Sequence, residues 1–214
     1  MIFVIFLLMA HAKSFSIEEA LRFGWGVLEK NFGLILQFIF ATLVLYFANF
    51  LFASVVGKAT TLAKVVDGLV GAVVALGWIY VALTFQAGKK PALENLQKVL
   101  SPVFLNYLLA SILYGLLVVV GLILLIVPGI YFAIKFGFFG YFIVDKKASS
   151  LDALKMSGKL TEGAVWSLFG FFVVVTLINF LGVLAFGIGL VVTIPITMLA
   201  GAQIYRSLSS QSKL

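Results

Sequence analysis

Residues Val127–Trp166, VPGIYFAIKFGFFGYFIVDKKASSLDALKMSGKLTEGAVW, decide the fold class of this chain. An apolar run that holds one cation, Lys135, gives way at Asp145 to a polar, amphipathic segment, and the next apolar run follows directly. A chain needs this alternation when it repeatedly enters and leaves a bilayer. The stretch therefore predicts a membrane helix, an interfacial helix and the start of another membrane helix.

The composition also places the chain in a membrane. Apolar residues make up 63% of its 214 residues and charged residues only 11%, whereas about 25% are charged in an ordinary soluble domain. A single polytopic membrane domain over residues 1–214 follows. The net charge of +7 comes from basic residues beside apolar runs, which membrane orientation explains, so we expect no nucleic acid. The chain has no cysteine, and we expect no cofactor and no bound metal.

Six charge-poor runs predict six transmembrane helices. They cover about 31–52, 65–85, 102–126, 128–144, 165–184 and 186–204. The three residues Val127–Gly129 are expected to form the whole turn between the third and fourth spans. Residues 1–10 are apolar but too short to span. We expect them to be retained at the interface or on the bundle, with His11 as a tolerated polar end.

Amphipathic segments precede each pair of spans. The first begins at a capping box, Ser16–Glu19, and the others cover about 88–100 and 146–163. Glu19-Ala-Leu-Arg22 and Asp152-Ala-Leu-Lys155 match as acidic-Ala-Leu-basic, and 94–97 is a degenerate third copy. The predicted fold is all-α: about six transmembrane helices as three hairpins, each preceded by an amphipathic interfacial helix. The repeat units are about 16–86, 87–145 and 146–207, with chance matching of short apolar strings as the alternative.

Several short motifs within 127–166 are shared with a known group of proteins. They are Val127-Pro-Gly-Ile-Tyr131 with Lys135, Ile143-Val-Asp145, Ala153-Leu-Lys155-x-Ser157, Leu160-Thr-x-Gly163 and Trp166. With them the chain, over about 127–206, resembles prokaryotic membrane proteins that are described as uncharacterised or as similar to the membrane domain of glycerophosphoryl diester phosphodiesterase. The resemblance implies a fold but no reaction, because in those phosphodiesterases the chemistry belongs to a soluble barrel domain.

The function expected from the residues is non-enzymatic. Nucleophile elbows, zinc-binding helices and phosphate-binding loops are missing from the sequence. We expect an integral protein of a prokaryotic cytoplasmic membrane with a structural or interaction role toward lipid or protein partners. A small transporter or lipid-handling channel is the alternative. It would need several polar groups that converge at mid-membrane, and the candidates are Gln37, Asn106, Thr176, Asn179 and Thr193.

The distribution of basic residues predicts the topology and a lipid-binding surface. Basic residues gather before the first span, in the 86–102 and 145–163 connectors and in the tail, whereas the other side has Lys58 and Lys64. Both termini are therefore expected in the cytoplasm. Seven lysines are candidates for contact with anionic headgroups: Lys89, Lys90, Lys98, Lys146, Lys147, Lys155 and Lys159. Alternatively, these lysines only set orientation during insertion.

Asp67 and Lys135 are the acid and the base that the prediction places inside spans. A charge in a bilayer needs a partner, water or an escape to the interface. We expect the two to form an intramembrane ion pair near the outer face. The alternatives are that Lys135 snorkels alone to the headgroups, or that it has a gating or substrate-contacting role.

Overall fold

The computed structural model describes residues 13–212, and all regular structure in this range is helical. The expectations for residues 1–12, including His11, lie outside it. The helices are α2 (Ile17–Lys30), α3 (Phe32–Val56), α4 (Thr61–Gln86), α5 (Leu93–Leu100), α6 (Phe104–Leu124), α7 (Ile126–Phe136), α8 (Phe139–Lys146), α9 (Ser150–Thr161), α10 (Val165–Leu184) and α11 (Leu190–Gln211).

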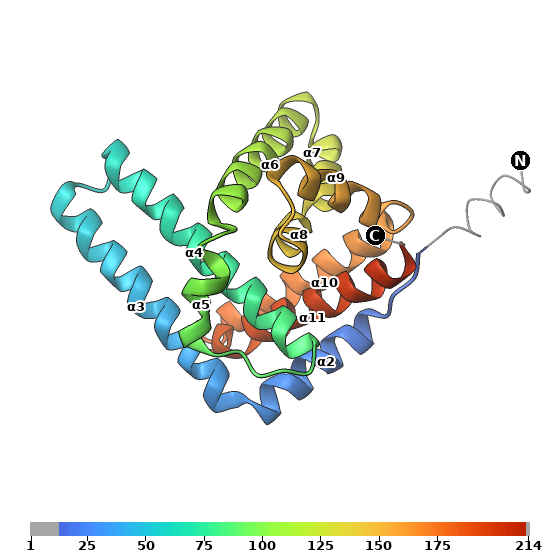
Figure 1. The fold of residues 1–214 in the computed structure, drawn as a ribbon, viewed down its shortest axis with the longest axis horizontal. Helices are drawn as coiled ribbons and strands as arrows, with labels where there is room; N and C mark the ends of the chain where they lie inside the picture. Colours follow the sequence, from blue (N-terminus) through green and yellow to red (C-terminus); the bar gives the residue numbers. More distant parts are fainter. Residues whose placement is uncertain (1–12, 213–214) are drawn as a thin grey trace, which may run out of the picture.

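Short helices and long hairpins alternate along the chain. Helix α2 precedes the hairpin α3–α4, α5 precedes α6–α7, and α9 precedes α10–α11, with α8 inserted between α7 and α9. Figure 1 shows the α3–α4 and α6–α7 hairpins projecting in different directions from the region where α8, α11 and α2 lie. The all-helical character agrees with the prediction, whereas α8 was not predicted as a separate helix; the three membrane hairpins and the internal repeat stay predictions.

Five helical segments are long and apolar enough to cross a membrane. They are Phe32–Val56, Thr61–Gln86, Phe104–Leu124, Ile126–Lys146 and Val165–Leu184. The predicted sixth span overlaps α11, which is not among them. Its carboxyl-terminal half carries polar residues such as Gln203, Arg206 and Ser207. Over residues 13–212 the structure is therefore all-helical with five candidate spans, and the arrangement of six spans stays a prediction.

The turn between α6 and α7 differs from the prediction. Leu125, with extended backbone (φ −166°, ψ 155°), joins the two helices, and Pro128 and Gly129 lie inside the first turn of α7. A proline fits there because the first-turn N–H groups have no partner within the helix. A Cβ on Gly121 would lie 2.8 Å from the Cα of Gly129. The two glycines therefore let the two helices lie in direct backbone contact just below their turn.

The predicted fourth span is divided into two helices. Helix α7 ends at Phe136 and α8 begins at Phe139. The backbone N–H of Phe138, between them, donates to Oγ of Ser157 on α9 at 3.1 Å. Helix α9 thus supplies an acceptor for an N–H group at the break, because a buried N–H without a hydrogen bond would be costly.

Helix α11 is the centre of the core. It packs against α2, α4 and α10, and its most deeply buried residues are Ala200, Ala202, Ile204, Tyr205 and Leu208. On α2, a Cβ at Gly24 would collide with the backbone oxygen of Ile196, so this close approach requires glycine. Ser16 caps α2 as expected, because its Oγ accepts from the N–H of Glu19 at 3.1 Å. The α2 helix thus lies along α11, with its charged residues Glu18 and Arg22 exposed.

Candidate functional site

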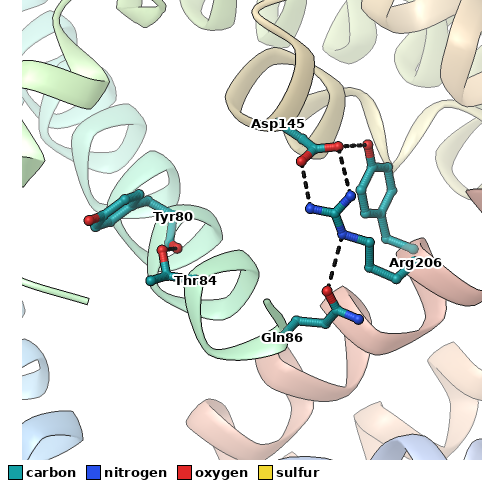
Figure 2. A network of polar contacts seen from close by, with 6 residues as sticks. Tyr80, Thr84, Gln86, Asp145 and Arg206 are labelled. Carbon is teal, nitrogen blue, oxygen red and sulfur yellow. Dashed lines mark hydrogen bonds and ion pairs between the residues drawn. The ribbon is translucent and has the colours of Figure 1, made fainter. Parts of the chain in front are cut away.

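Three distant segments of the chain meet at one polar cluster, formed by Gln86, Asp145, Tyr205 and Arg206 and called here the Asp145–Arg206 cluster. Two guanidinium nitrogens of Arg206 donate to the two carboxylate oxygens of Asp145, at 2.7 and 3.2 Å. The Tyr205 hydroxyl donates to the same carboxylate at 2.9 Å, and Nε of Arg206 donates to Oε1 of Gln86 at 3.1 Å. Figure 2 shows how the cluster joins the ends of α4 and α8 to α11.

The cluster is largely shielded from water. The Asp145 side chain is 15% exposed and that of Arg206 36%, while Tyr205 is fully buried. Burial and the neighbouring carboxylate raise the pKa of the Tyr205 hydroxyl, which stays a neutral donor. Because the guanidinium and carboxylate pair in a bidentate geometry, their hydrogen-bonding capacity is mostly used within the protein. The cluster therefore holds helices together, as a clamp, and offers few free hydrogen-bonding groups to a ligand.

Sequence reasoning did not single out this cluster. Asp145 entered the prediction as the point where an apolar run becomes polar and as part of the motif Ile143-Val-Asp145, and Arg206 only as one of the basic residues of the tail. One signal was available: each follows an apolar run whose predicted polar end lies on the same side of the membrane. Opposite charges at equal depth are candidates for pairing.

The clamp brings two lysine pairs to one region of the surface. Lys89 and Lys90 follow Gln86 by three and four residues, and Lys146 and Lys147 directly follow Asp145. An extended chain spans at most about 3.6 Å per residue, so each pair has its Cα atoms within about 15 Å of its anchoring residue. Since Gln86 and Asp145 bind one guanidinium, the two pairs share one region of the surface.

All seven predicted headgroup lysines are exposed. Besides the two pairs, they are Lys98 on α5 and Lys155 and Lys159 on α9. Within residues 13–212 none of the seven forms an ion pair. Their ammonium groups are available to an anion from outside the protein.

Lys13 has a different position from these seven. Its Nζ donates to the backbone oxygens of Lys159 and Leu160 at 2.7 and 2.9 Å, near the carboxyl end of α9. Desolvation lowers the pKa of the Lys13 amine, and the charge of Glu162 opposes this shift. A cation at this position interacts favourably with the helix dipole. Lys13 thus fastens the start of the described chain to α9.

The predicted pairing of Asp67 with Lys135 is not present in the structure. Asp67 instead accepts a hydrogen bond from Nδ2 of Asn49 at 2.8 Å. The two residues lie on opposite arms of the α3–α4 hairpin. The acid therefore has a neutral partner opposite it in its own hairpin.

Lys135 lies next to α9 instead of Asp67. Its backbone oxygen accepts from the hydroxyls of Ser157 and Thr161 at 3.0 and 3.1 Å. Its Nζ lies 5.4 Å from the ring centroid of Tyr131, within reach of a cation–π interaction. The polar helix α9 therefore lies beside the carboxyl end of α7, which the prediction had placed within the fourth span, near the outer face of the membrane.

The polar residues inside the predicted spans do not form one shared network. No hydrogen bond within residues 13–212 joins any two of the five transport candidates. Gln37 is exposed on α3, Thr176 donates to the backbone of its own helix, and Asn179 donates to Thr197 at 3.4 Å across the α10–α11 hairpin. No group of three His, Cys, Asp or Glu residues in this range lies close enough to hold a metal.

No protein-family model, curated protein or solved structure matches this chain. The resemblance to the membrane domain of glycerophosphoryl diester phosphodiesterase therefore stays a prediction.

Proposed function

We propose that this chain is a non-enzymatic integral protein of a prokaryotic cytoplasmic membrane, with both termini in the cytoplasm and a lysine-rich surface that binds anionic lipid headgroups. One observation carries the proposal: the Asp145–Arg206 cluster holds two exposed lysine pairs in one region of the surface of a charge-poor chain. Each lysine near an anionic membrane surface contributes about 1 kcal/mol of attraction. Salt screens this attraction, with a screening length of about 10 Å at an ionic strength of 0.1 M.

The lipid-binding surface is tested by replacing Lys89, Lys90, Lys146 and Lys147 with glutamine. The protein is reconstituted in vesicles that mix phosphatidylglycerol with phosphatidylcholine, and the lipid in its first shell is measured with spin-labelled lipids. We expect the preference for phosphatidylglycerol to fall and to become less sensitive to salt. Replacing Lys58 and Lys64 on the opposite side is the control. An unchanged preference in the fourfold variant would leave the lysines with a role in orientation alone.

The proposed topology has a separate test. The chain has no cysteine, so single cysteines at Ser150 and Thr60 report their own exposure to an impermeant thiol reagent in intact cells. We expect labelling at position 60, in the α3–α4 loop, and none at position 150. The reverse pattern would contradict cytoplasmic termini.

A lipid-handling channel or small transporter is the second candidate function. The lipid-handling channel is favoured by an apolar groove of about 430 Å³ between α3, α4, α5 and α6, within the range of ligand-binding cavities. Mass spectrometry of the gently purified protein separates the two functions. A defined polar solute that is retained in proportion to the protein would favour transport.

A further inference from the structure

The groove between α3, α4, α5 and α6, called here the α5 groove, is lined almost entirely by apolar side chains. Residues from all four helices contribute, among them Leu45, Val73, Gly77, Leu96, Leu100 and Phe104. Figure 1 shows α5 against the α3–α4 hairpin, at the point where the chain continues into α6. In a bilayer an apolar groove of this kind is occupied by hydrocarbon rather than by water.

The two polar side chains that α3 and α4 contribute to the groove wall, Thr42 and Trp78, are already hydrogen-bonded. Nε1 of Trp78 donates to Oγ1 of Thr42 at 3.2 Å, and the Thr42 hydroxyl donates to the backbone oxygen of Phe38 at 2.9 Å. A polar ligand would find no free partner at this depth, and burying it there would be unfavourable. The wall therefore fits an acyl chain.

Helix α5 separates this groove from a basic surface. Leu93, Leu96 and Leu100 line the groove, whereas Lys98 is exposed on another face of the same helix. Residues 89–98 contain three lysines and one acid. An amphipathic basic helix lies at the level of the headgroups with its apolar face toward the acyl chains. The groove thus begins where a lipid has its phosphate, and the charge around that position is positive.

We propose that the α5 groove binds one acyl chain of an anionic phospholipid, whose headgroup lies among the lysines at 89, 90 and 98. Gln97 and Ser101, at the α5 side of the groove, supply hydrogen-bond donors beside the headgroup. This inference rests on the proposed function, because it uses the same attraction between lysines and anionic headgroups. It adds one defined lipid-binding site, and the apolar groove is what distinguishes this site from general attraction between lysines and headgroups.

Gly77 offers a way to fill the groove without disturbing the helices. A Cβ at this position would meet only the side chain of Leu96, at 4.0 Å. Gly77→Leu therefore directs its side chain into the groove, and leucine is a better helix former than glycine. Gly68→Leu is the matched control, since this residue of α4 has no neighbour within 4 Å of an added Cβ and does not line the groove.

Trp78 reports the occupant directly, because its side chain lines the groove. The other two tryptophans, Trp25 and Trp166, are exposed and are replaced by phenylalanine. The protein is reconstituted with phospholipids whose acyl chains carry bromine, which quenches nearby tryptophan. We expect brominated phosphatidylglycerol to quench Trp78 at least twice as strongly as brominated phosphatidylcholine at equal mole fraction. Gly77→Leu is expected to remove this difference and Gly68→Leu to keep it.

The outcomes separate this inference from the proposed function. Equal quenching by the two lipids, or a preference that survives Gly77→Leu, would overturn the groove site. The proposed function would stand without the groove if replacing Lys89, Lys90, Lys146 and Lys147 with glutamine nevertheless lowered the preference for phosphatidylglycerol in the first lipid shell. Native mass spectrometry provides a second readout. One phosphatidylglycerol per wild-type chain, lost in Gly77→Leu and retained in Gly68→Leu, supports the site, whereas equal retention in both variants refutes it.

Discussion

Replacing Arg206 with methionine removes the cation of the clamp and leaves the Asp145 carboxylate with one remaining donor in the cluster, the Tyr205 hydroxyl. Removing one partner of a fully buried pair costs about 3–5 kcal/mol, because the other charge is stranded. The Arg206 side chain is 36% exposed and that of Asp145 15%, so water offsets part of this penalty. We expect a loss of about 2 kcal/mol in the free energy of unfolding.

The double change Asp145→Asn with Arg206→Met removes both charges. Because the stranded charge is then absent, the double variant should lose less stability than the sum of the two single losses. We expect the difference, which is the coupling energy, to be about 1.5–2 kcal/mol, in the range of hydrogen bonds to charged groups. Unfolding of the purified protein by sodium dodecyl sulfate in mixed micelles, followed by circular dichroism, measures each variant.

The surface pair of Glu18 and Arg22 is the matched control. Its shortest contact is also 2.7 Å, but its side chains are 72% and 79% exposed. Such a pair, four residues apart on a helix, contributes only about 0.3–0.5 kcal/mol. If the coupling energy of Asp145 with Arg206 were no larger than that of this pair, the conclusion that the cluster is a shielded clamp would be refuted.

Three further predictions follow from individual residues. Tyr205→Phe removes a donor to the clamp carboxylate and should lower the free energy of unfolding by about 1.5 kcal/mol at neutral pH. Since the pKa of this hydroxyl is raised on folding, its contribution is complete below about pH 10, the ordinary tyrosine value, and is lost as the pH rises through the raised value. A stability difference between wild type and variant that did not shrink at alkaline pH would contradict this. Gly24→Ala should destabilise by about 1–3 kcal/mol because its methyl group meets the backbone of α11. Gly26→Ala, in open space on the same helix, should stabilise by about 0.5–1 kcal/mol, and equal effects of the two in thermal unfolding would argue against this packing. Leu125, at the tip of α6–α7, lies about 15 Å along α7 from its contact with α9, half of a hydrocarbon core near 30 Å. A cysteine there should resist impermeant thiol reagents from both sides of the membrane, whereas labelling as fast as at Thr60 would place the tip in water.

Some tertiary contacts across the α3–α4 hairpin could have been predicted from the sequence, but the prediction looked for a contact between other helices. Asn49 and Asp67 are 18 residues apart, and Thr42 and Trp78 are 36 apart, yet both pairs are opposite one another across the single α3–α4 loop. An antiparallel hairpin with a short loop fixes this register. The prediction for Asp67 looked for the base placed inside a span, Lys135, instead of the residue across the hairpin, and the structure gives Asp67 the neutral partner Asn49.

The sequence by itself determined that the chain is helical, apolar and divided into long runs with short polar connectors. Inside a bilayer the backbone has to satisfy its own hydrogen bonds, so an uninterrupted apolar run of sufficient length has to be a helix. The bounds of α3, α4, α6 and α10 lie close to the predicted runs for this reason. The capping of α2 by Ser16 could likewise be predicted, because it involves only residues close together in the sequence. Such features depend on neighbouring residues alone.

Only the tertiary structure decided which apolar surfaces face protein and which face lipid. Lipid tails are as apolar as leucine, so hydropathy does not distinguish a helix buried in protein from one exposed to the bilayer. The central position of α11 and the α5 groove were therefore invisible in the sequence. The pairing of Asp145 with Arg206 across 61 residues depends on that packing, because the ends of α4 and α8 must both meet α11 before the guanidinium can reach Asp145 and Gln86.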